Sequence, residues 1–288
     1  MRVIPKPIRR GVERFMTERV GKAVYGNLAG YRNNREGERR LRRARTSPIV
    51  VDSRADELRA NGCGFYSGLD QDCLRVVREK YCRKIEDPDF SIPKNADQRP
   101  AQEGEEVYQV PLRDTAGTIP EVLDLIDAGL QDYLRSYFLG EFRIHSILAW
   151  RIFHVPPEVL ERHTPFALKW HNDAHTTDTL KLFVALSDIG EDDGPFHFVT
   201  KNRTKEIMRS GFRNRHDYGA AESMVEENVN RMTGPAGTVA LCNTTTNLHR
   251  AGIPAKGRKR DILQYRLESS LAPFDPHQPL EDIRLYRS

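Results

Sequence analysis

From residue 142 onward, the sequence breaks into short apolar runs, rich in β-branched and aromatic residues and separated by Gly, Pro, Asp and Asn. Five such runs occupy residues 142–155, 180–189, 195–200, 237–243 and 261–267. Short strands that are joined by turns, and not by helices, favour an antiparallel sandwich or barrel over a parallel α/β sheet. This pattern predicts a β core for the second half of the chain.

The first half of the chain has helical periodicity instead. We expect one helix from Asp52 to a cap near Gly62, a second over residues 69–85, and a third over residues 119–138, where apolar residues recur at three- and four-residue steps. Residues 86–104 are polar and predict a long loop. The predicted fold class is therefore mainly β with packed helices, the N-terminal helical region lying outside a jelly-roll core at about residues 142–270.

Residues 1–45 differ from the rest in charge. They hold 14 Lys or Arg against 4 Asp or Glu, a net charge of +10, whereas the whole chain carries only +4. Apolar residues recur at helical spacing from Ile8 to Val24, which predicts a basic amphipathic helix. Such a helix can bind an anionic membrane or an acidic partner, or pack on the protein's own core. Nucleic acid is not expected, because aromatic residues are sparse and no binding motif is present.

Residues 46–288 are expected to form a single domain. No apolar run approaches the roughly 18 to 20 residues that span a bilayer, and MRVIPKPIRR has charges and prolines where a secretory leader is apolar. We therefore expect a cytoplasmic protein, with peripheral contact at the inner face of the membrane as the option that residues 1–45 leave open. The four cysteines lack C-x-x-C spacing, which indicates buried or half-buried thiols and not a zinc ribbon or a redox pair.

The segment KWHNDAH, residues 169–175, places two histidines around one aspartate. It allows a metal site of His171 and Asp173, a metal site of His171 and His175, or a polar edge strand. Pro165 and the β-branched residues that follow argue against a helix, so the i, i+4 pair of histidines is disfavoured. On a strand, residues i and i+2 point the same way, so His171 and Asp173 would converge. His175 is then expected in the wall of the site.

A third ligand has to come from elsewhere, and His249 is the best candidate. It lies in GPAGTVALCNTTTNLHRAG, where an apolar strand leads into a polar turn. Two histidines and one carboxylate leave three positions of a metal open, the arrangement of non-haem Fe(II) oxygenases. Downstream, GRKRDILQYRL contains Arg258 and Arg260, and a planar guanidinium can anchor the carboxylate of a dicarboxylic acid.

Four segments together, WHND, LKLFVALSDIGEDDGPFHFVTKNRTK, GPAGTVALCNTTTNLHRAG and RKRDILQYRL, resemble the phytanoyl-CoA dioxygenase group of Fe(II)/2-oxoglutarate oxygenases. The resemblance covers roughly residues 142–270 and implies a double-stranded β-helix, the cupin-like jelly roll. It implies that His171, Asp173 and His249 bind iron and that Arg260 holds the distal carboxylate of 2-oxoglutarate, with Arg258 as the second choice. The stretch VTKNRTK departs from the family, which often has a serine-histidine pair there.

The implied activity is hydroxylation of an unactivated C–H bond in a small molecule, sugar or lipid-linked substrate, with O2 consumed and succinate and CO2 released. Asp173 favours hydroxylation, because related halogenases have a small residue at that position. Candidate substrate-pocket residues are Trp170, His175, Lys181 and Arg151. The basic segment 1–45 favours an acidic sugar or a lipid-linked substrate. Two alternatives stay open: a catalytically silent or non-enzymatic metal-binding member recruited to a membrane or partner, and a zinc hydrolase.

Overall fold

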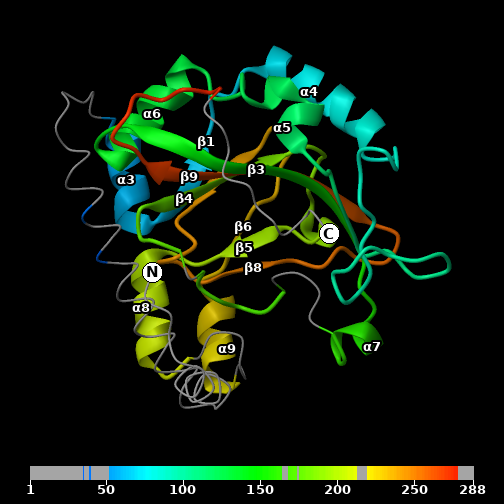
Figure 1. Ribbon diagram of the computed structural model, residues 1–288. Coiled ribbons are helices and arrows are strands. Elements are labelled where there is room, and N and C mark those ends of the chain that lie inside the picture. Colours follow the sequence, from blue (N-terminus) through cyan, green and yellow to red (C-terminus); the bar gives the residue numbers. More distant parts are fainter. Residues whose placement is uncertain are drawn as a thin grey trace, which may run out of the picture.

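The computed structural model describes residues 35, 39, 52–163, 168–173, 175–212 and 219–277. The predicted amphipathic helix in residues 1–45 lies outside this range, apart from Arg35 and Arg39, so that helix and the division of the chain at residue 45 stay predictions. Two antiparallel sheets form the centre of the molecule (Figure 1). Of the helices in the described ranges, none combines the length and the apolar character that crossing a membrane requires.

The larger sheet has six strands in the order β1-β7-β4-β9-β3-β2. Their bounds are β1 Cys63–Tyr66, β2 Gln109–Pro111, β3 Phe142–Phe153, β4 Thr179–Ala185, β7 Val239–Cys242 and β9 Lys259–Ser269. Every neighbouring pair is antiparallel. Strands β3, β4, β7 and β9 coincide with four of the five predicted runs. The sequence does not predict the edge strands β1 and β2, because three or four residues are too few to establish an alternating pattern.

The smaller sheet has three strands in the order β6-β5-β8. They are β5 Phe196–Phe198, β6 Asn230–Arg231 and β8 His249–Ala251. Strand β5 lies within the remaining predicted run, residues 195–200. The two sheets face each other, since the rings of Phe183 on β4 and Phe196 on β5 pack with centroids 4.3 Å apart. The predicted fold class, mainly β with packed helices, is confirmed.

Alternation along β9 sorts its side chains between the two faces of the larger sheet. Leu263, Tyr265 and Leu267 are fully buried in the main apolar core, beneath the helices. Ile262 instead joins Phe183 and others in a second apolar cluster between the sheets. Because successive side chains of a strand point to opposite faces, Arg260, Ile262 and Gln264 share the face toward the smaller sheet.

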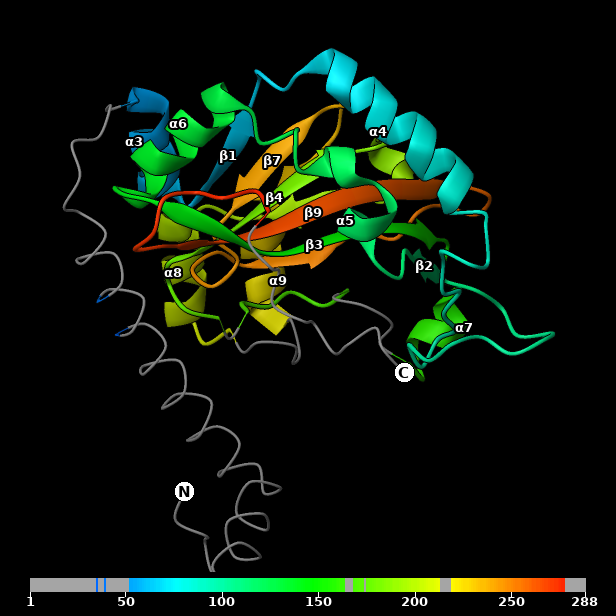
Figure 2. The ribbon, with the colours of Figure 1, turned by 45° about the horizontal axis from the view of Figure 1, so that its top comes forward.

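Helices cover the outer face of the larger sheet (Figure 2). They are α3 Ser53–Asn61, α4 Gln71–Lys84, α5 Thr115–Thr118 and α6 Ala128–Phe138. The carboxylates of Asp52 and Asp70 cap the first turns of α3 and α4, and α3 ends at Gly62 in the left-handed conformation that glycine adopts without strain. The first two predicted helices are therefore confirmed.

The third predicted helix is shorter than expected. A 3-10 turn, η1 Pro120–Val122, comes first, and α6 begins only after Asp127. The carboxylate of Asp127 accepts a hydrogen bond from the backbone N–H of Leu130 at 2.8 Å, which starts a new helix at that point. Apolar spacing predicts the buried face over the whole range, but it does not detect an aspartate that caps within it.

The remaining elements are α7 Pro157–Leu160, η2 Glu191–Asp193, α8 Lys201–Arg209 and α9 Gly219–Glu226. Helices α8 and α9 lie beside the smaller sheet (Figure 1). A third apolar cluster contains Trp170, Val199, Ile207, Phe212, Val225 and Leu248. Residues 86–104 form the expected loop, with isolated bridges only. The four cysteines are free; Cys63 and Cys242 are buried and Cys73 is half-buried as predicted, but Cys82 is exposed.

Candidate functional site

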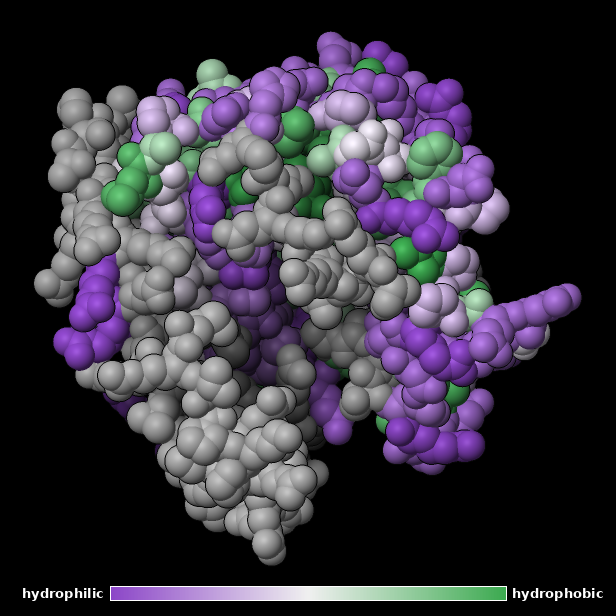
Figure 3. Space-filling model, in the orientation of Figure 1, coloured by the Kyte–Doolittle hydropathy of each residue, from purple (hydrophilic) through white to green (hydrophobic). Residues whose placement is uncertain are grey.

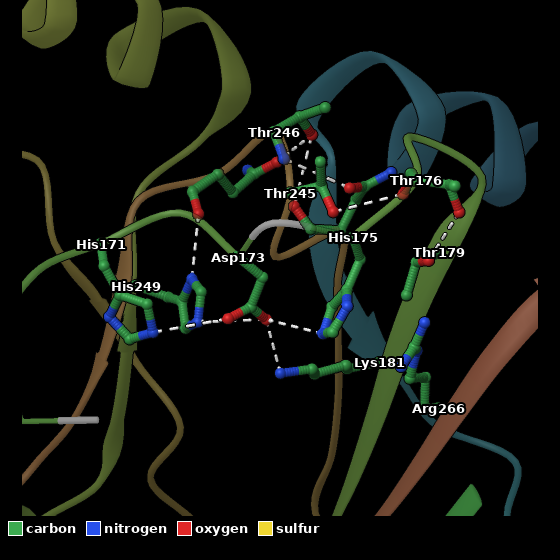
Figure 4. Close-up of polar contacts among 12 residues, drawn as sticks. His171, Asp173, His175, Thr176, Thr179, Lys181, Thr245, Thr246, His249 and Arg266 are labelled. Carbon is green, nitrogen blue, oxygen red and sulfur yellow. Dashed lines mark hydrogen bonds and ion pairs between the residues drawn. The ribbon is translucent and has the colours of Figure 1, made fainter. Parts of the chain in front are cut away.

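Two histidines and one carboxylate converge at one edge of the space between the sheets. The Nε2 atom of His171 lies 3.5 Å from Oδ1 of Asp173, and Nε2 of His249 lies 3.7 Å from Oδ2 of the same residue. One donor atom from each of the three residues lies within 4.8 Å of the other two. Figure 4 shows both imidazoles pointing at the Asp173 carboxylate. The structure thus brings together the three residues that the sequence indicates as metal ligands.

Backbone hydrogen bonds hold these residues in place. The N–H of His171 donates to the carbonyl of His249 at 3.1 Å, and the N–H of His249 donates back at 3.0 Å. The N–H of Asp173 donates to the carbonyl of Thr244 at 2.9 Å. The strand expected at KWHNDAH is an isolated bridge at His171 followed by irregular chain, so the i, i+2 argument applies here to an extended segment and not to a regular strand.

The other ring nitrogen of each histidine is held by the backbone. Nδ1–H of His171 donates to the carbonyl of Lys169 at 2.7 Å, and Nδ1–H of His249 donates to the carbonyl of Asn247 at 3.1 Å. A carbonyl oxygen only accepts, so Nδ1 carries the proton and Nε2 is the atom left for a metal. Outer hydrogen bonds of this kind fix the ring orientation of metal-binding histidines.

The charge states also suit a divalent cation. Burial alone would raise the pKa of Asp173, but its interaction with His171 and the charge of Lys181 outweigh this and hold that pKa far below its usual range. Burial lowers the pKa of His249 to about 3. At neutral pH the carboxylate is therefore ionised and the imidazole of His249 is neutral, as metal ligation requires.

Two further predicted residues lie next to Asp173. The Nζ of Lys181, on β4, donates to Oδ2 of Asp173 at 2.6 Å. The Nε2 of His175 lies 3.7 Å from the same oxygen, with 30% of its side chain exposed, and burial lowers the pKa of His175 to about 4. Lys181 lines the cavity described below, whereas His175 lies outside its lining. The interpretation that makes His171 and Asp173 the metal pair is the one that the geometry supports.

The three donors open into a cavity of about 190 Å³ between the sheets. It is several times the volume that one water molecule occupies, so it can hold a small organic molecule. Its lining consists of Gln109, Trp150, Ile152, His171, Asp173, Lys181, Phe183, Phe196, His249, Ala251, Arg260, Ile262 and Gln264. The face of the molecule that Figure 3 presents is hollowed near its middle, and hydrophilic residues colour the hollow.

Arg260 contributes a buried cation to this cavity. Only 3% of the residue is exposed, and its Nε and Nη1 have no hydrogen-bond acceptor in the described part of the chain. Burial lowers the pKa of Arg260 to about 10, which still leaves it protonated at neutral pH. An unsatisfied buried donor costs about 1–3 kcal/mol, and more when it is charged, so the arrangement calls for a bound anion such as a carboxylate.

Arg258 does not take this role. Its side chain is 57% exposed, and its Nε and Nη2 donate to the two carboxylate oxygens of Asp193 at 2.8 and 3.1 Å. The second choice for the carboxylate-binding arginine is therefore wrong.

Two predicted substrate residues also lie away from the cavity. Trp170 is fully buried in the third apolar cluster, where the Arg250 guanidinium lies 4.8 Å from its ring centroid. Arg151 points to the outer face of the larger sheet and donates to both carboxylate oxygens of Asp261, at 2.7 and 3.0 Å. Both assignments are corrected, because in each case an adjacent residue, His171 or Trp150, points inward instead.

The cavity lining also includes Gln109, Trp150 and Gln264, which the motifs around the metal ligands do not indicate. Alternation with Arg260 on β9 is a signal that finds Gln264, because the two residues are four positions apart on one strand. Gln109 has no such signal, since its strand β2 is three residues long.

No protein-family model matches the sequence, and no curated protein matches it either. Solved structures share its fold. EctD from S. alaskensis with bound Fe has a TM-score of 0.55 at 14% identity, covering 78% of each chain. HygX from Streptomyces hygroscopicus, with nickel and 2-oxoglutarate bound, has a TM-score of 0.51 at 14% identity, covering 78% of this chain and 89% of HygX.

A third similar structure is the epimerase SnoN from nogalamycin biosynthesis, in complex with Fe3+, alpha ketoglutarate and nogalamycin RO. Its TM-score is 0.51 at 14% identity, covering 77% of this chain and 85% of SnoN. At these identities the similarity establishes a common fold. The jelly roll that the sequence predicts is thereby confirmed.

Proposed function

We propose that this chain is an Fe(II)- and 2-oxoglutarate-dependent dioxygenase that hydroxylates an unactivated C–H bond. One observation carries the proposal: the His171, Asp173 and His249 donors open into the same small cavity as the buried, unpartnered donors of Arg260. A metal site alone would not need a buried guanidinium. A metal-chelating dicarboxylate uses both, one end at the metal and the other at the arginine.

The cavity residues suit both Fe(II) and 2-oxoglutarate. Two imidazole nitrogens and one carboxylate form the donor set of non-haem Fe(II) oxygenases and leave positions open for the cosubstrate and O2. Arg260 offers Nε and Nη1 to the distal carboxylate of 2-oxoglutarate. When bound, Fe(II) with 2-oxoglutarate and O2 supplies the oxidising power that hydroxylates a C–H bond and releases succinate and CO2.

The apolar part of the lining has its own role. Phe183, Phe196 and Ile262 are nearly fully buried and line the same cavity as the metal-site residues and Arg260. They keep bulk water from the space around the donors, which strengthens the electrostatic hold of Arg260 on an anion. Exclusion of water also protects reactive intermediates from side reactions.

The similar structures support the cofactor assignment. EctD has been crystallised with Fe and, separately, with 2-oxoglutarate and 5-hydroxyectoine, and HygX with nickel and 2-oxoglutarate. SnoN is an epimerase, so the fold accommodates more than one outcome. Asp173 supports hydroxylation here, since a carboxylate ligand leaves no vacant position for a halide.

The test is 2-oxoglutarate turnover by the purified full-length chain. With Fe(II), ascorbate and O2, slow uncoupled conversion of 13C-labelled 2-oxoglutarate to succinate is expected in the NMR spectrum. Asp173→Asn and Zn(II)-loaded wild type should produce none. Equal succinate in wild type and Asp173→Asn would contradict the proposal, as would 2-oxoglutarate that binds and is never turned over, which is the result expected of a catalytically silent protein.

A further inference from the structure

A second group of cationic side chains lies beside the metal site, apart from Arg260. Lys181 on β4 and Arg266 on β9 are direct cross-strand partners in the larger sheet. Arg266 follows Arg260, Ile262 and Gln264 at two-residue steps, so it lies on the same inner face of the strand. Figure 4 shows Arg266 next to Lys181, whose ammonium group reaches Asp173. This group of cations therefore borders the metal-site carboxylate directly.

Arg260 and Arg266 lie well apart on β9, and both ends of the proposed cosubstrate are already assigned, one to Arg260 and the other to the metal. The two arginines are six residues apart on one strand, which at about 3.3 Å per residue corresponds to roughly 20 Å between their backbones. The carboxyl carbons of 2-oxoglutarate are separated by four C–C bonds of about 1.5 Å each. If Arg260 holds the cosubstrate, Arg266 is left for a different molecule.

Arg266 is only partly neutralised. Its Nη2 donates to Oε1 of Glu268 at 2.7 Å, while its Nε has no acceptor in the described part of the chain. Glu268 is also shared, because Nη2 of Arg143 donates to its other oxygen at 3.1 Å. Glu268 is thus shared between Arg266 and Arg143, and Lys181 has Asp173 as its partner.

Metal binding would weaken the neutralisation of Lys181 by Asp173. Asp173 is the carboxylate that neutralises Lys181, and as a metal ligand it shares its charge with the cation. In the loaded site Lys181 is therefore less fully neutralised, while Arg266 shares Glu268 with Arg143. The side chains of Lys181 and Arg266 are 15% and 20% exposed, so dissolved molecules can reach this group.

We propose that the substrate carries an anionic group, a carboxylate or a phosphate, which Arg266 and Lys181 bind beside the metal. This inference rests on the proposed oxygenase function and specifies its substrate class. The planar guanidinium of Arg266 and the ammonium of Lys181 recognise the same oxyanion chemistry, whether it comes from an acidic sugar or from a phosphorylated molecule. The C–H bond that is hydroxylated then lies close to the anionic group.

The test uses the full-length chain, loaded with Fe(II) and 2-oxoglutarate without oxygen. Phenyl phosphate is followed by 31P NMR and carboxyl-13C benzoate by 13C NMR, with 13C-labelled benzyl alcohol as the neutral probe. An anion bound beside paramagnetic Fe(II) has its resonance broadened, and titration gives its affinity. Broadening of the phosphate or of the carboxylate shows which anion the site prefers, while benzyl alcohol should stay sharp.

Three variants make the test specific. Arg266→Gln should weaken anion binding about 10-fold or more. Glu268→Gln should strengthen it, because the carboxylate that competes for Arg266 is gone, and a misfolded protein would not show this gain. Arg258→Gln loses the same charge from an exposed arginine that pairs with Asp193 outside the cavity, and it should bind like wild type.

Absence of broadening for both anions would overturn the inference, as would equal affinity in Arg266→Gln and Arg258→Gln. If the chain is not an oxygenase, a different result is expected: 2-oxoglutarate produces no visible charge-transfer band with the Fe(II)-loaded chain. In that case the same titration on the Mn(II)-loaded chain, which needs no 2-oxoglutarate, still decides whether the anion site exists.

Discussion

The ammonium group of Lys181 lies 2.6 Å from Oδ2 of Asp173, so the proposed metal-binding carboxylate has a cationic partner within the protein. Lys181 and a bound metal ion compete for the same carboxylate, and their like charges repel. Lys181 therefore stabilises the metal-free chain at the expense of metal affinity.

Replacing Lys181 should lower the stability of the metal-free chain and raise its metal affinity. In Lys181→Met, the metal-free chain loses a charge-assisted hydrogen bond worth about 1.5–3 kcal/mol, so its melting temperature should fall. The rise in melting temperature on adding Mn(II) should be larger than in wild type, because the competing cation is gone. Lys259→Met, at the exposed start of β9, is the control. An equal metal-induced rise in Lys181→Met and wild type would contradict the competition.

The two histidines of KWHNDAH should differ in their effect on metal binding. His171→Gln removes a proposed ligand and should weaken Mn(II) binding by more than the roughly 10- to 100-fold that loss of an outer partner causes. His175→Gln should weaken it less than about 10-fold, because His175 lies beside Asp173 without joining the three donors. Equilibrium dialysis or electron paramagnetic resonance of free Mn(II) measures both affinities. Comparable losses in the two variants would assign His175 to the metal site.

Arg258, just before β9, and Arg260, within it, should differ in their effect on 2-oxoglutarate binding. Arg260→Gln removes the buried cation from the cavity and should weaken cosubstrate binding about 10- to 150-fold, the equivalent of one charge-assisted hydrogen bond. Arg258→Gln should leave that affinity unchanged, since its guanidinium pairs with Asp193 outside the cavity. Titration of 2-oxoglutarate into the metal-loaded variants measures both. A loss confined to Arg258→Gln would reverse the assignment.

Glu268 should make stability depend on pH in the acid range. Burial would raise the pKa of Glu268, but His145 and Arg266 outweigh this and lower it to about 2, against 4.5 for an ordinary glutamate. The folded chain thus binds this proton more weakly than the unfolded chain. The stabilisation is complete above about pH 4.5 and is lost as the pH falls toward about 2.

Urea unfolding of wild type and Glu268→Gln between about pH 6 and about pH 3.5 measures this contribution. Wild type should lose on the order of 1 kcal/mol more than the variant over that interval, out of a total contribution on the order of 3 kcal/mol. Identical pH dependence in the two proteins would mean that the Glu268 carboxyl titrates normally.

Whether a helix or strand can be predicted from the sequence alone depends on its length. Strands β3, β4 and β9, of seven to twelve residues, have enough positions to establish alternation, and caps such as Asp52 and Gly62 mark helix ends. Edge strand β2 has three residues and includes Pro111, so no sequence pattern predicts it. Gln109, a polar residue of the cavity lining, is missed for that reason.

Prediction of the site from sequence has a second limit, the direction in which side chains point. Metal-ligand chemistry identifies His171, Asp173 and His249 without coordinates, because few residue types bind such a metal. The direction of neighbouring side chains is harder, since shifting a strand by one residue exchanges its two faces. That is why Arg151 is expected in the pocket when Trp150 is the residue there, and why Trp170 is expected beside the metal when its ring packs in the third apolar cluster.

The most direct test is anaerobic addition of 2-oxoglutarate to the Fe(II)-loaded chain, followed by visible absorption. If His171, Asp173 and His249 hold iron and Arg260 holds the distal carboxylate, a charge-transfer band of the iron–2-oxoglutarate chelate should appear and saturate at one cosubstrate per chain. The band should be lost in Asp173→Asn and should need more 2-oxoglutarate in Arg260→Gln. No band in the folded, iron-loaded wild-type chain would contradict the account.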